Sequence, residues 1–180
     1  MASELPTKQS TATVKERKLH VDDIDWTTWK PTEYANLCFV IRDRQILLIR
    51  KKRGLGAGKI NAPGGRIEKG ETALASAIRE TQEEIGVTPT GLEQMGELLF
   101  EFLDGYKLHV AVFTASGCEG DLRETDEATP MWKSIDHIPF DEMWQDDPYW
   151  LPLLLARKKF RGCFLFDGER LLSHQLESHE

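Results

Sequence analysis

The stretch "GGRIEKGETALASAIRETQEEIG", residues 64–86, gathers acidic residues at the end of a helix-like pattern. Glu80, Glu83 and Glu84 are three and four residues apart, where side chains on a helix are neighbours and like charges repel. The chain already carries a formal net charge of -7 at pH 7. The stretch therefore predicts either a solvated acidic face or a binding site for something positive.

The helical wheel of this stretch, drawn with about 100° per residue, places the three glutamates on one narrow arc. A separate apolar stripe is expected to face the core and consists of Leu74, Ile78, Thr81 and Ile85. Small residues beside the acidic arc leave room for a loop to approach, and they are Ala73, Ser76 and Ala77. The predicted helix covers residues 72–84, and Gly86 is expected to end it.

Converging carboxylates suit a hard divalent cation. Mg²⁺ prefers oxygen ligands, and one or two carboxylates together with phosphate oxygens complete its coordination shell. The loop before the helix has two consecutive glycines, Gly64 and Gly65, where a backbone carbonyl can turn toward a metal with no side chain in the way. Charge runs are usually solvated faces. The two glycines favour the metal site over that plainer interpretation.

The composition is that of a single-domain globular protein. Its 180 residues are enough to bury a core, with 40% hydrophobic and 29% charged residues. No apolar run reaches the roughly 20 residues of a membrane span. An isoelectric point of about 5.3 argues against non-specific binding of nucleic acid polymers. Three scattered cysteines and no apolar leader predict reduced thiols and a cytoplasmic location.

The first 30 residues are expected to be an N-terminal extension. Residues 1–20 are polar, have no apolar periodicity and predict a partly disordered tail. Trp26 and Trp29 are candidates for docking on the body of the protein. The main folded domain is then predicted over residues 31–180.

The rest of the chain predicts a mixed sheet with helices on its faces, an α/β or α+β sandwich. A β-hairpin is expected over residues 35–52 with its turn at 42–44, followed by a glycine-rich loop over 53–66. Three further strands, a second helix and a closing strand are predicted over residues 95–103, 107–115, 129–135, 148–159 and 162–166.

The spacing in the opening stretch resembles the signature of the Nudix hydrolases, G-x5-E-x7-R-E-U-x-E-E-x-G-U, in which U is a bulky apolar residue. Gly65, Glu71 and the run from Arg79 to Val87 supply every fixed position. The departure is Thr81, which stands where an apolar residue is usual, on the core side of the helix. A match of this length is much more specific than a lone three-glycine motif.

The resemblance implies a sandwich fold and Mg²⁺-dependent cleavage of a nucleoside diphosphate linked to a further group, with Mn²⁺ as an alternative ion. The implied metal ligands are Glu80, Glu83, Glu84 and the carbonyl of Gly65. Arg79 is implied to orient the glutamates, and Glu71 to brace the loop against the helix. The metal is implied to neutralise phosphate charge and to acidify a water that attacks phosphorus in line.

The catalytic base has two candidates. The family takes its base from this motif or from a later loop. Glu84, which lies in the motif, is the first candidate. Glu127, in "ETDEATPMW", is the second candidate for base or metal ligand, and an ordinary surface-loop acid is an equally open interpretation of it.

The similarity continues outside the motif and narrows the family. The stretches "KKRGLGAGKIN", "FEF", "HVAVF", "TDEATPMW" and "IPFDEMWQDDPYWLPLLLARKKFRGCF" are similar to the branch that hydrolyses oxidised purine nucleoside triphosphates. The resemblance covers roughly residues 36–166. It implies hydrolysis of 8-oxo-dGTP and 2-hydroxy-dATP to the monophosphate and pyrophosphate, which sanitises the nucleotide pool.

Trp144, Asp146 and Asp147 are the candidates for binding the base. An aromatic face stacks on a base, and polar groups that bind its edge allow the site to reject analogues. In an apolar pocket one of the two acids can stay protonated and donate a hydrogen bond. The resemblance implies that both acids bind the base edge.

The resemblance and the glycine loop supply further substrate-binding candidates, which are Asn36, Lys51, Asn61, Pro63, Gly64, Gly65, Arg66 and Phe100. Phe100 and Phe102 alternate along one strand, and plain core is an open interpretation of either. Lys51, Lys52 and Arg53 predict a positive field at the pocket mouth, although strand-end lysines are commonly just solvated. Leu55 stands where related enzymes have Phe, which leaves the base preference open.

Other nucleotide and metal motifs are excluded by spacing. "RGLGAGKI" lacks the first glycine and the hydroxyl residue of a P-loop, and its glycines lack the dinucleotide-binding spacing. The five histidines are isolated and predict no zinc site.

Two alternative functions stay open. One is a Nudix hydrolase for another substrate, such as a dinucleotide, ADP-ribose or a methylated purine nucleotide. The other is a non-catalytic nucleotide-binding module, which is disfavoured because such relatives typically lose the motif glutamates. We expect a monomer whose partner is a small-molecule nucleotide, with neither a nucleic acid polymer nor a membrane as a partner.

Overall fold

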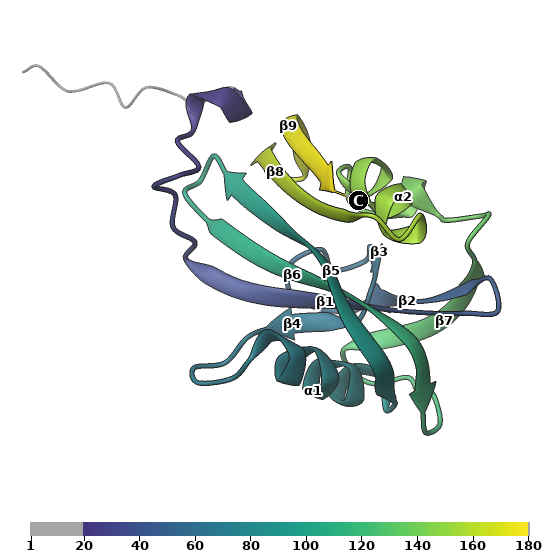
Figure 1. The fold of residues 1–180 in the computed structure, drawn as a ribbon. Helices are drawn as coiled ribbons and strands as arrows, with labels where there is room; N and C mark the ends of the chain where they lie inside the picture. The colour runs from purple at the N-terminus through teal and green to yellow at the C-terminus, as the bar shows by residue number, and fades with distance from the viewer. Residues whose placement is uncertain (1–19, 180) are drawn as a thin grey trace, which may run out of the picture.

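A mixed β-sheet with one helix against each of its faces forms the body of the protein (Figure 1). The computed structural model describes residues 20–179. The nine strands in this range are β1 (Glu33–Arg42), β2 (Gln45–Lys51), β3 (Ile60–Asn61), β4 (Gly64–Arg66), β5 (Thr88–Phe102), β6 (Lys107–Glu119), β7 (Ala128–Ser134), β8 (Lys159–Asp167) and β9 (Arg170–His179). The α-helices are α1 (Ala73–Ile85) and α2 (Asp147–Leu155), and the 3₁₀ helices are η1 (Val21–Asp23) and η2 (Phe140–Glu142). The predicted sandwich is confirmed.

The strand order is β3-β2-β1-β6-β5-β8-β9, with β4 paired to β1 and β7 paired to β2. β1 runs parallel to β6, and β5 runs parallel to β8. The hairpin between β1 and β2 turns at Asp43 and Arg44, whose φ angles of 49° and 57° match a tight primed turn. The predicted hairpin and its turn are therefore confirmed.

The glycine-rich segment over residues 53–66 differs from the prediction because it contains the short strands β3 and β4. β4 pairs antiparallel with β1 through Asn36↔Gly65 and Leu37↔Gly64. A Cβ on Gly64 would overlap the backbone of Asn36, so the pairing requires glycine there. The glycines that predicted a loop are thus the residues that allow β4 to pair closely with β1.

The helix α1 begins and ends where the sequence predicts. Thr72 caps its first turn by accepting a hydrogen bond from the backbone N–H of Ala75 at 3.1 Å. Gly86 ends the helix in the left-handed conformation, with φ 80°. Its backbone N–H donates to the carbonyl of Gln82.

The predicted core stripe of α1 is wrong in part. Leu74 is 45% exposed and Ile78 is only half-buried, whereas Ala77, Thr81 and Ile85 are fully buried. The helix is rotated so that its small residues face the sheet, because the glycines of β4 let it approach closely. Thr81 keeps its hydroxyl satisfied by donating to the carbonyl of Ala77 at 2.7 Å. The one departure from the family signature therefore packs in the core without a lost hydrogen bond.

Two hydrophobic cores lie on opposite faces of the sheet. The larger one packs α2, through Trp150, Leu151 and Leu154, against β1, β5, β6 and β8. The smaller one packs Ala77 and Ile85 of α1 against β1, β2 and β6. Alternating side chains of the shared strands point into one core or the other. The sheet thus separates the glutamates of α1 from the face covered by α2.

Several boundaries in the second half of the chain differ from the prediction. β5 starts at Thr88 instead of residue 95, and β9 was not predicted, because its weakly alternating polar sequence gives little strand signal. α2 ends at Leu155, four residues early. The chain then turns at Arg157, whose φ is 59°.

The tryptophans before β1 pack on the body, as predicted. The indole N–H of Trp29 donates to Glu101, and Val21 is 1% exposed in a small cluster with Leu99 and Cys163. The predicted tail over residues 1–20 lies outside the described residues except for its last one. The proposed boundary at residue 31 stays a prediction. In the described part of the chain, no helix combines the length and apolarity needed to span a bilayer.

Candidate active site

Three carboxylates converge beside the open edge of β4. Glu80 and Glu84 come from the second half of α1, and Glu127 comes from the loop before β7. One oxygen of each lies within 4.8 Å of the others. Below, the glutamate cluster means these three residues. The structure therefore brings together the first and the second candidate for the catalytic base.

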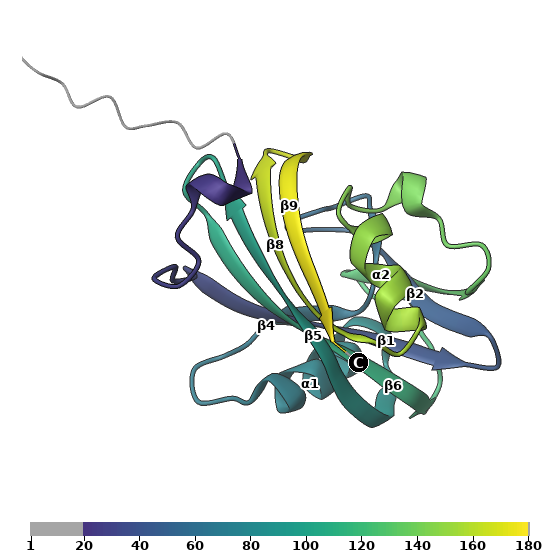
Figure 2. The ribbon, with the colours of Figure 1, turned by 45° about the horizontal axis from the view of Figure 1, so that its top comes forward.

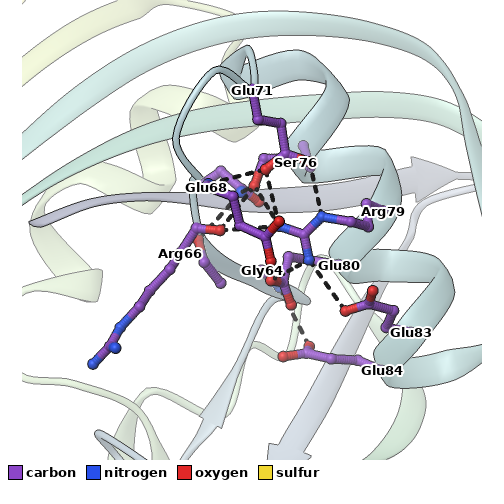
Figure 3. Close-up of polar contacts among 12 residues, drawn as sticks. Gly64, Arg66, Glu68, Glu71, Ser76, Arg79, Glu80, Glu83 and Glu84 are labelled. Carbon is purple, nitrogen blue, oxygen red and sulfur yellow. Dashed lines mark hydrogen bonds and ion pairs between the residues drawn. The ribbon is translucent and has the colours of Figure 1, made fainter.

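Glu84 is the most buried member of the glutamate cluster. It is 5% exposed and accepts a hydrogen bond from the backbone N–H of Gly64 at 3.3 Å (Figure 3). Burial raises the pKa of Glu84 to about 8, against the opposing effects of that hydrogen bond and of Lys51. Burial also raises the pKa of Glu80. The cluster thus holds negative charge in a place where solvent stabilises it poorly, which favours a bound cation.

The glycine pair of β4 forms one wall of this site. A Cβ on Gly65 would overlap the carboxylate of Glu80, so only glycine lets the strand lie this close to the helix. Gly65 also accepts a hydrogen bond at its carbonyl from Nδ2 of Asn36, at 3.2 Å. Gly65 is therefore next to Glu80, on a strand with fixed register, and its carbonyl stays a predicted ligand.

Arg79 holds the acidic residues in place. Its guanidinium donates two hydrogen bonds to Glu71, at 2.8 and 3.0 Å, and further ones to Glu80 at 2.8 Å and Glu83 at 3.1 Å (Figure 3). It also reaches the hydroxyl of Ser76 and the carbonyl of Arg66. Hydrogen bonds from Arg79 lower the pKa of Glu71 to about 2. These contacts would let Arg79 orient the glutamates and Glu71 brace the loop, and both roles stay predictions.

Glu83 lies apart from the glutamate cluster. Its side chain is 52% exposed and pairs with Arg79. Glu127, by contrast, belongs to the cluster and forms an ion pair with Arg53. The sequence had given Glu83 a firmer place than Glu127, because Glu83 shares the helix arc while Glu127 is distant in the chain.

An aromatic pocket opens on the other side of β1 and extends to the same glycines. Its volume is about 130 Å³. The residues at its polar positions are Asn36, Lys51, Asn61, Asp146 and Asp147. Its apolar wall includes Leu55, Phe100, Phe102, Leu108, Trp144, Trp150 and Phe166. The pocket thus contains most of the predicted substrate-binding residues and ends beside the glutamate cluster, at Gly64 and Gly65.

The two aspartates at the start of α2 are almost completely buried. Asp146 and Asp147 are 2% and 3% exposed. Asp146 accepts from the indole N–H of Trp150 at 2.8 Å, and Asp147 accepts from the backbone N–H of Trp144 at 3.1 Å. Burial raises the pKa of both carboxyls, and the charge of Asp146 raises that of Asp147 further. Both effects favour the protonated form of the carboxyl of Asp147.

Asn36 joins the pocket to the metal side. It is 1% exposed, lines the aromatic pocket, and donates from Nδ2 to Gly65 and to the hydroxyl of Ser76 at 2.8 Å. Because the carbonyl of Gly65 can only accept, the orientation of the amide is fixed. Its Oδ1 has no hydrogen-bond partner among residues 20–179. A buried acceptor without a partner is costly, so this atom is suited to accept a hydrogen bond from a ligand.

Two predicted substrate-binding residues do not line the pocket. Arg66 points away and pairs with Glu33 at 3.1 Å, and Pro63 uses its carbonyl to accept from the backbone N–H of Cys38. Strand β4 alternates its side chains between two faces, so neighbours of Gly64 and Gly65 cannot all face the same site.

The pocket also contains residues that the sequence did not assign to it. Phe166 and Trp150 line it although neither was a candidate. The alternation in "GCFLF" was a usable signal for Phe166 once the strand was expected. Ser76 is a further omission, because only the folded chain shows its hydroxyl joining Asn36, Arg66 and Arg79.

The donor set of the glutamate cluster fits a divalent cation. It offers carboxylate oxygens and a nearby backbone carbonyl, without nitrogen or sulfur. Hard cations such as Mg²⁺ and Mn²⁺ prefer such oxygen ligands. Because Gly65 has no Cβ, α1 and β4 lie close enough for both elements to contribute oxygen ligands.

Comparison with known proteins agrees with this site. Residues 31–154 match the NUDIX domain. The chain is 43% identical over 151 residues to the oxidized purine nucleoside triphosphate hydrolase of Danio rerio, covering 83% of this chain and 97% of the relative. It is 42% identical over 142 residues to the protein of the same name from Mus musculus, covering 78% and 91%.

The solved structures point the same way. The crystal structure of a MutT protein from Bacillus halodurans superposes with a TM-score of 0.73 at 28% identity, covering 81% of this chain and 97% of that one. The chain therefore belongs to the Nudix family and is a Nudix hydrolase. Nudix hydrolases act on small-molecule nucleotides and generally need a divalent metal ion.

Proposed function

We propose that this protein hydrolyses oxidised purine nucleoside triphosphates, such as 8-oxo-dGTP and 2-hydroxy-dATP, to the monophosphate and pyrophosphate. The observation that carries the proposal is the buried pair Asp146 and Asp147 in an aromatic pocket that ends at the glutamate cluster. The names of the fish and mouse relatives support the same activity. Removal of these nucleotides keeps oxidised bases out of DNA.

The aspartate pair is proposed to bind the edge of the base. A protonated carboxyl donates a hydrogen bond, and an ionised one accepts. Because burial favours the protonated form of both carboxyls, the pair can hold a proton on either residue and present donors and acceptors in more than one arrangement. That versatility fits one pocket to both oxidised guanine and oxidised adenine. Trp144, which lines the same end, supplies the stacking face.

Asn36 and Lys51 are proposed to bind the part of the nucleotide between the base and the triphosphate. Both line the pocket between the aspartates and the glycines of β4. The unpartnered Oδ1 of Asn36 is suited to a sugar hydroxyl, which can donate. Lys51 lies close enough to Glu84 to lower its pKa, so its charge is also close to the bound phosphates. Asn61 lines the pocket as a further polar contact.

The glutamate cluster and Gly65 are proposed to hold Mg²⁺, with Mn²⁺ as a substitute. When bound, the cation would neutralise triphosphate charge and acidify water. Glu84 remains our first candidate for the base, because its buried carboxylate has a raised proton affinity and lies among the other ligands. Arg79 fixes the directions of Glu71, Glu80 and Glu83. We retain Glu83 as a possible ligand that binds after moving from Arg79.

A second substrate class has one observation in its favour. Leu55 is 47% exposed and lines the pocket without offering an aromatic surface. A looser wall would suit a methylated purine nucleotide, a dinucleotide or ADP-ribose better than a wall that stacks on the base. The panel of nucleotides described in the next paragraph distinguishes this substrate class from the oxidised purine nucleotides.

The test is a steady-state assay with Mg²⁺, and again with Mn²⁺, on a panel of nucleotides. The panel contains 8-oxo-dGTP, 2-hydroxy-dATP, the unmodified dGTP and dATP, O6-methyl-dGTP, ADP-ribose and a diadenosine polyphosphate. We expect kcat/KM for the two oxidised nucleotides to exceed that for dGTP by at least roughly 10-fold, as a site that depends on polar base contacts allows. Equal or better turnover of dGTP would refute the sanitising role.

We also propose that the protein acts as a monomer in the cytoplasm. The free thiols of Cys38, Cys118 and Cys163 support a reducing compartment. Light scattering on the purified protein measures its mass, and localisation of a tagged chain tests the compartment.

A further inference from the structure

Residues 20–32 run across the face of the sheet opposite the aromatic pocket before β1 begins, and we call them the brace. Most of them precede the residues that match the NUDIX domain, which start at residue 31. In Figures 1 and 2 the purple brace runs from beside the ends of β8 and β9 to the start of β1. Its position on the sheet is therefore a property of this chain that the family match does not explain.

The brace is hydrogen-bonded to the sheet at three anchors. Thr32 exchanges hydrogen bonds with the backbone of Lys107 on β6, with its N–H donating to the carbonyl at 2.9 Å. The indole of Trp29 donates to Glu101 on β5 at 2.9 Å. The backbone N–H of Val21 donates to the hydroxyl of Ser173 on β9 at 2.7 Å.

These anchors lie in one row across the sheet. Lys107 is the register partner of Glu101, Glu101 of Leu165, and Leu165 of Ser173. The row thus runs through β6, β5, β8 and β9, which are consecutive neighbours in the sheet. A segment bonded to the first, second and fourth strands of one row restrains the spacing and curvature of all four.

The opposite face of the same row is the wall of the aromatic pocket. Phe100 and Phe102 flank Glu101, Leu108 follows Lys107, and Phe166 follows Leu165. All four of these neighbours line the pocket. Because side chains alternate along a strand, holding Glu101 from behind also fixes the directions of Phe100 and Phe102.

Between its anchors the brace is packed against the sheet. Val21 and Ile24 are buried, and Val21 contacts Leu99 and Cys163. The rings of Trp26 and Trp29 lie 5.4 Å apart and cover that cluster. The pairing of β8 with β9 shifts register between Leu165 and Phe166, beside the third anchor. The brace therefore supports the part of the sheet where regular pairing is interrupted.

We propose that the brace positions the aromatic wall for nucleotide binding and that Trp29 is a positioning residue acting through Glu101. The choice of substrate in this inference rests on the proposed function. The mechanical restraint of the sheet by the brace is independent of it. The inference assigns a role in nucleotide affinity to a segment without contact to the pocket. Metal binding and the chemical step depend on α1 and β4, and none of the three anchors is on these elements, so both are expected to be unaffected.

The test compares Trp29→Ala and Trp29→Phe with the unmodified full-length protein. Displacing a wall that contacts the substrate is expected to raise KM for 8-oxo-dGTP by roughly 10-fold in Trp29→Ala, with kcat within about two-fold. Trp29→Phe keeps an aromatic side chain, smaller than the indole, and loses the N–H that bonds Glu101, so roughly a three-fold rise is expected. Ser173→Ala removes a different anchor and is expected to act in the same direction. Affinity for Mn²⁺, measured by calorimetry, should stay unchanged in all three.

The matched control is Leu92→Ala, at the other end of β5 and packed against the core under α1. It is expected to lower the melting temperature without raising KM. If Trp29→Phe and Ser173→Ala leave KM unchanged, or if Leu92→Ala raises it equally, the brace only stabilises the fold and the proposal is wrong.

Failure of the proposed function is recognised separately, because the unmodified protein would then not turn over oxidised nucleotides. Hydrogen exchange decides the brace in that case. Amides of residues 99–102 and 163–166 should exchange faster in Trp29→Ala than in Leu92→Ala, and equal rates would overturn the restraint.

Discussion

The protein contains two groups of acidic residues that the same sheet separates, and they differ in the cation that accompanies them. On the α1 side, burial raises the pKa of Glu80 and Glu84. Arg79 nevertheless forms ion pairs with Glu71, Glu80 and Glu83, and it lowers the pKa of Glu71. On the α2 side, Asp146 and Asp147 have no cation in hydrogen-bond contact, and burial raises their pKa values. The first arrangement keeps charge available for a cation. The second favours neutral acids, which can donate hydrogen bonds to a base.

The largest effect is expected from Glu84→Gln, which removes the most buried charge of the glutamate cluster while keeping the side chain's size. We predict a loss in kcat of roughly 10³-fold, since a ligand and candidate base becomes a neutral amide. Steady-state kinetics on 8-oxo-dGTP measures it, and circular dichroism confirms that the fold is retained.

Glu83→Gln is the matched comparison, because Glu83 lies one residue away on the same helix and outside the cluster. A clearly smaller loss is expected for it. Equal losses would mean that the bound state brings Glu83 into the metal site, and near-normal turnover of Glu84→Gln would exclude Glu84 from catalysis.

Arg79→Lys is expected to have the next largest effect. Lysine keeps the charge but cannot reproduce the fork that binds Glu71, Glu80 and Glu83 together. Groups that orient metal ligands typically contribute 10- to 100-fold, so kcat should fall by about that factor and the Mn²⁺ affinity should fall with it. Unchanged Mn²⁺ affinity would show that Arg79 acts on the substrate and not on the ligands.

The sequence predicted the α1 side better than the pocket side for a physical reason. Residues of one helix have fixed relative directions, so the spacing of Glu80, Glu83 and Glu84 already implies one shared arc. Two of the three, Glu80 and Glu84, belong to the cluster, and Glu83 lies beside it with Arg79. Glu127 joins them only because β7 pairs with β2, bringing Ala128 opposite Lys51. A pairing between distant segments leaves no local signal, so its role was left open.

The pocket side depends on such long-range contacts throughout. Its wall combines β5 and β8, which pair in parallel from Gly96↔Phe160 to Phe102↔Phe166. The helix α2 lies between these two strands in the chain. Asp146 and Asp147 were identified through resemblance and not through periodicity, and Phe166 was missed. Leu74 shows the same limit, because the wheel fixed its angle relative to neighbours but not the rotation of α1 against the sheet.

Asp147→Asn addresses the pocket side directly. An amide is always a donor, so the variant should lock one hydrogen-bonding arrangement and change the ratio of kcat/KM between 8-oxo-dGTP and 2-hydroxy-dATP by roughly 10-fold. The substitution leaves the glutamate cluster untouched, so Mn²⁺ affinity serves as the internal control. A constant ratio would mean that the aspartates do not distinguish the two bases.

The smallest expected effect is on the free energy of unfolding. It concerns the pH dependence that Asp146 and Asp147 contribute. Asp146 has a pKa of about 6 in the folded protein against 3.8 for a free side chain, and burial together with the charge of Asp146 also raises the pKa of Asp147. Between those values the folded state binds more protons than the unfolded state. The free energy of unfolding contributed by the pair is therefore complete below pH 4 and is lost as the pH rises through 6 and above.

In Asp147→Asn the amide is neutral at every pH, so part of this dependence disappears. We predict that urea unfolding gives the variant and the unmodified protein similar stabilities at pH 4, with the variant more stable by about 1–2 kcal/mol at pH 8. Asp141→Asn, at an exposed position close in the chain, is the control and should leave the difference between the two pH values unchanged. The contribution of Glu84 is common to all three proteins and cancels in the comparison. If Asp147→Asn is the less stable protein at pH 8, folding does not raise the pKa of the buried carboxyl, and the contrast between the two faces of the sheet fails.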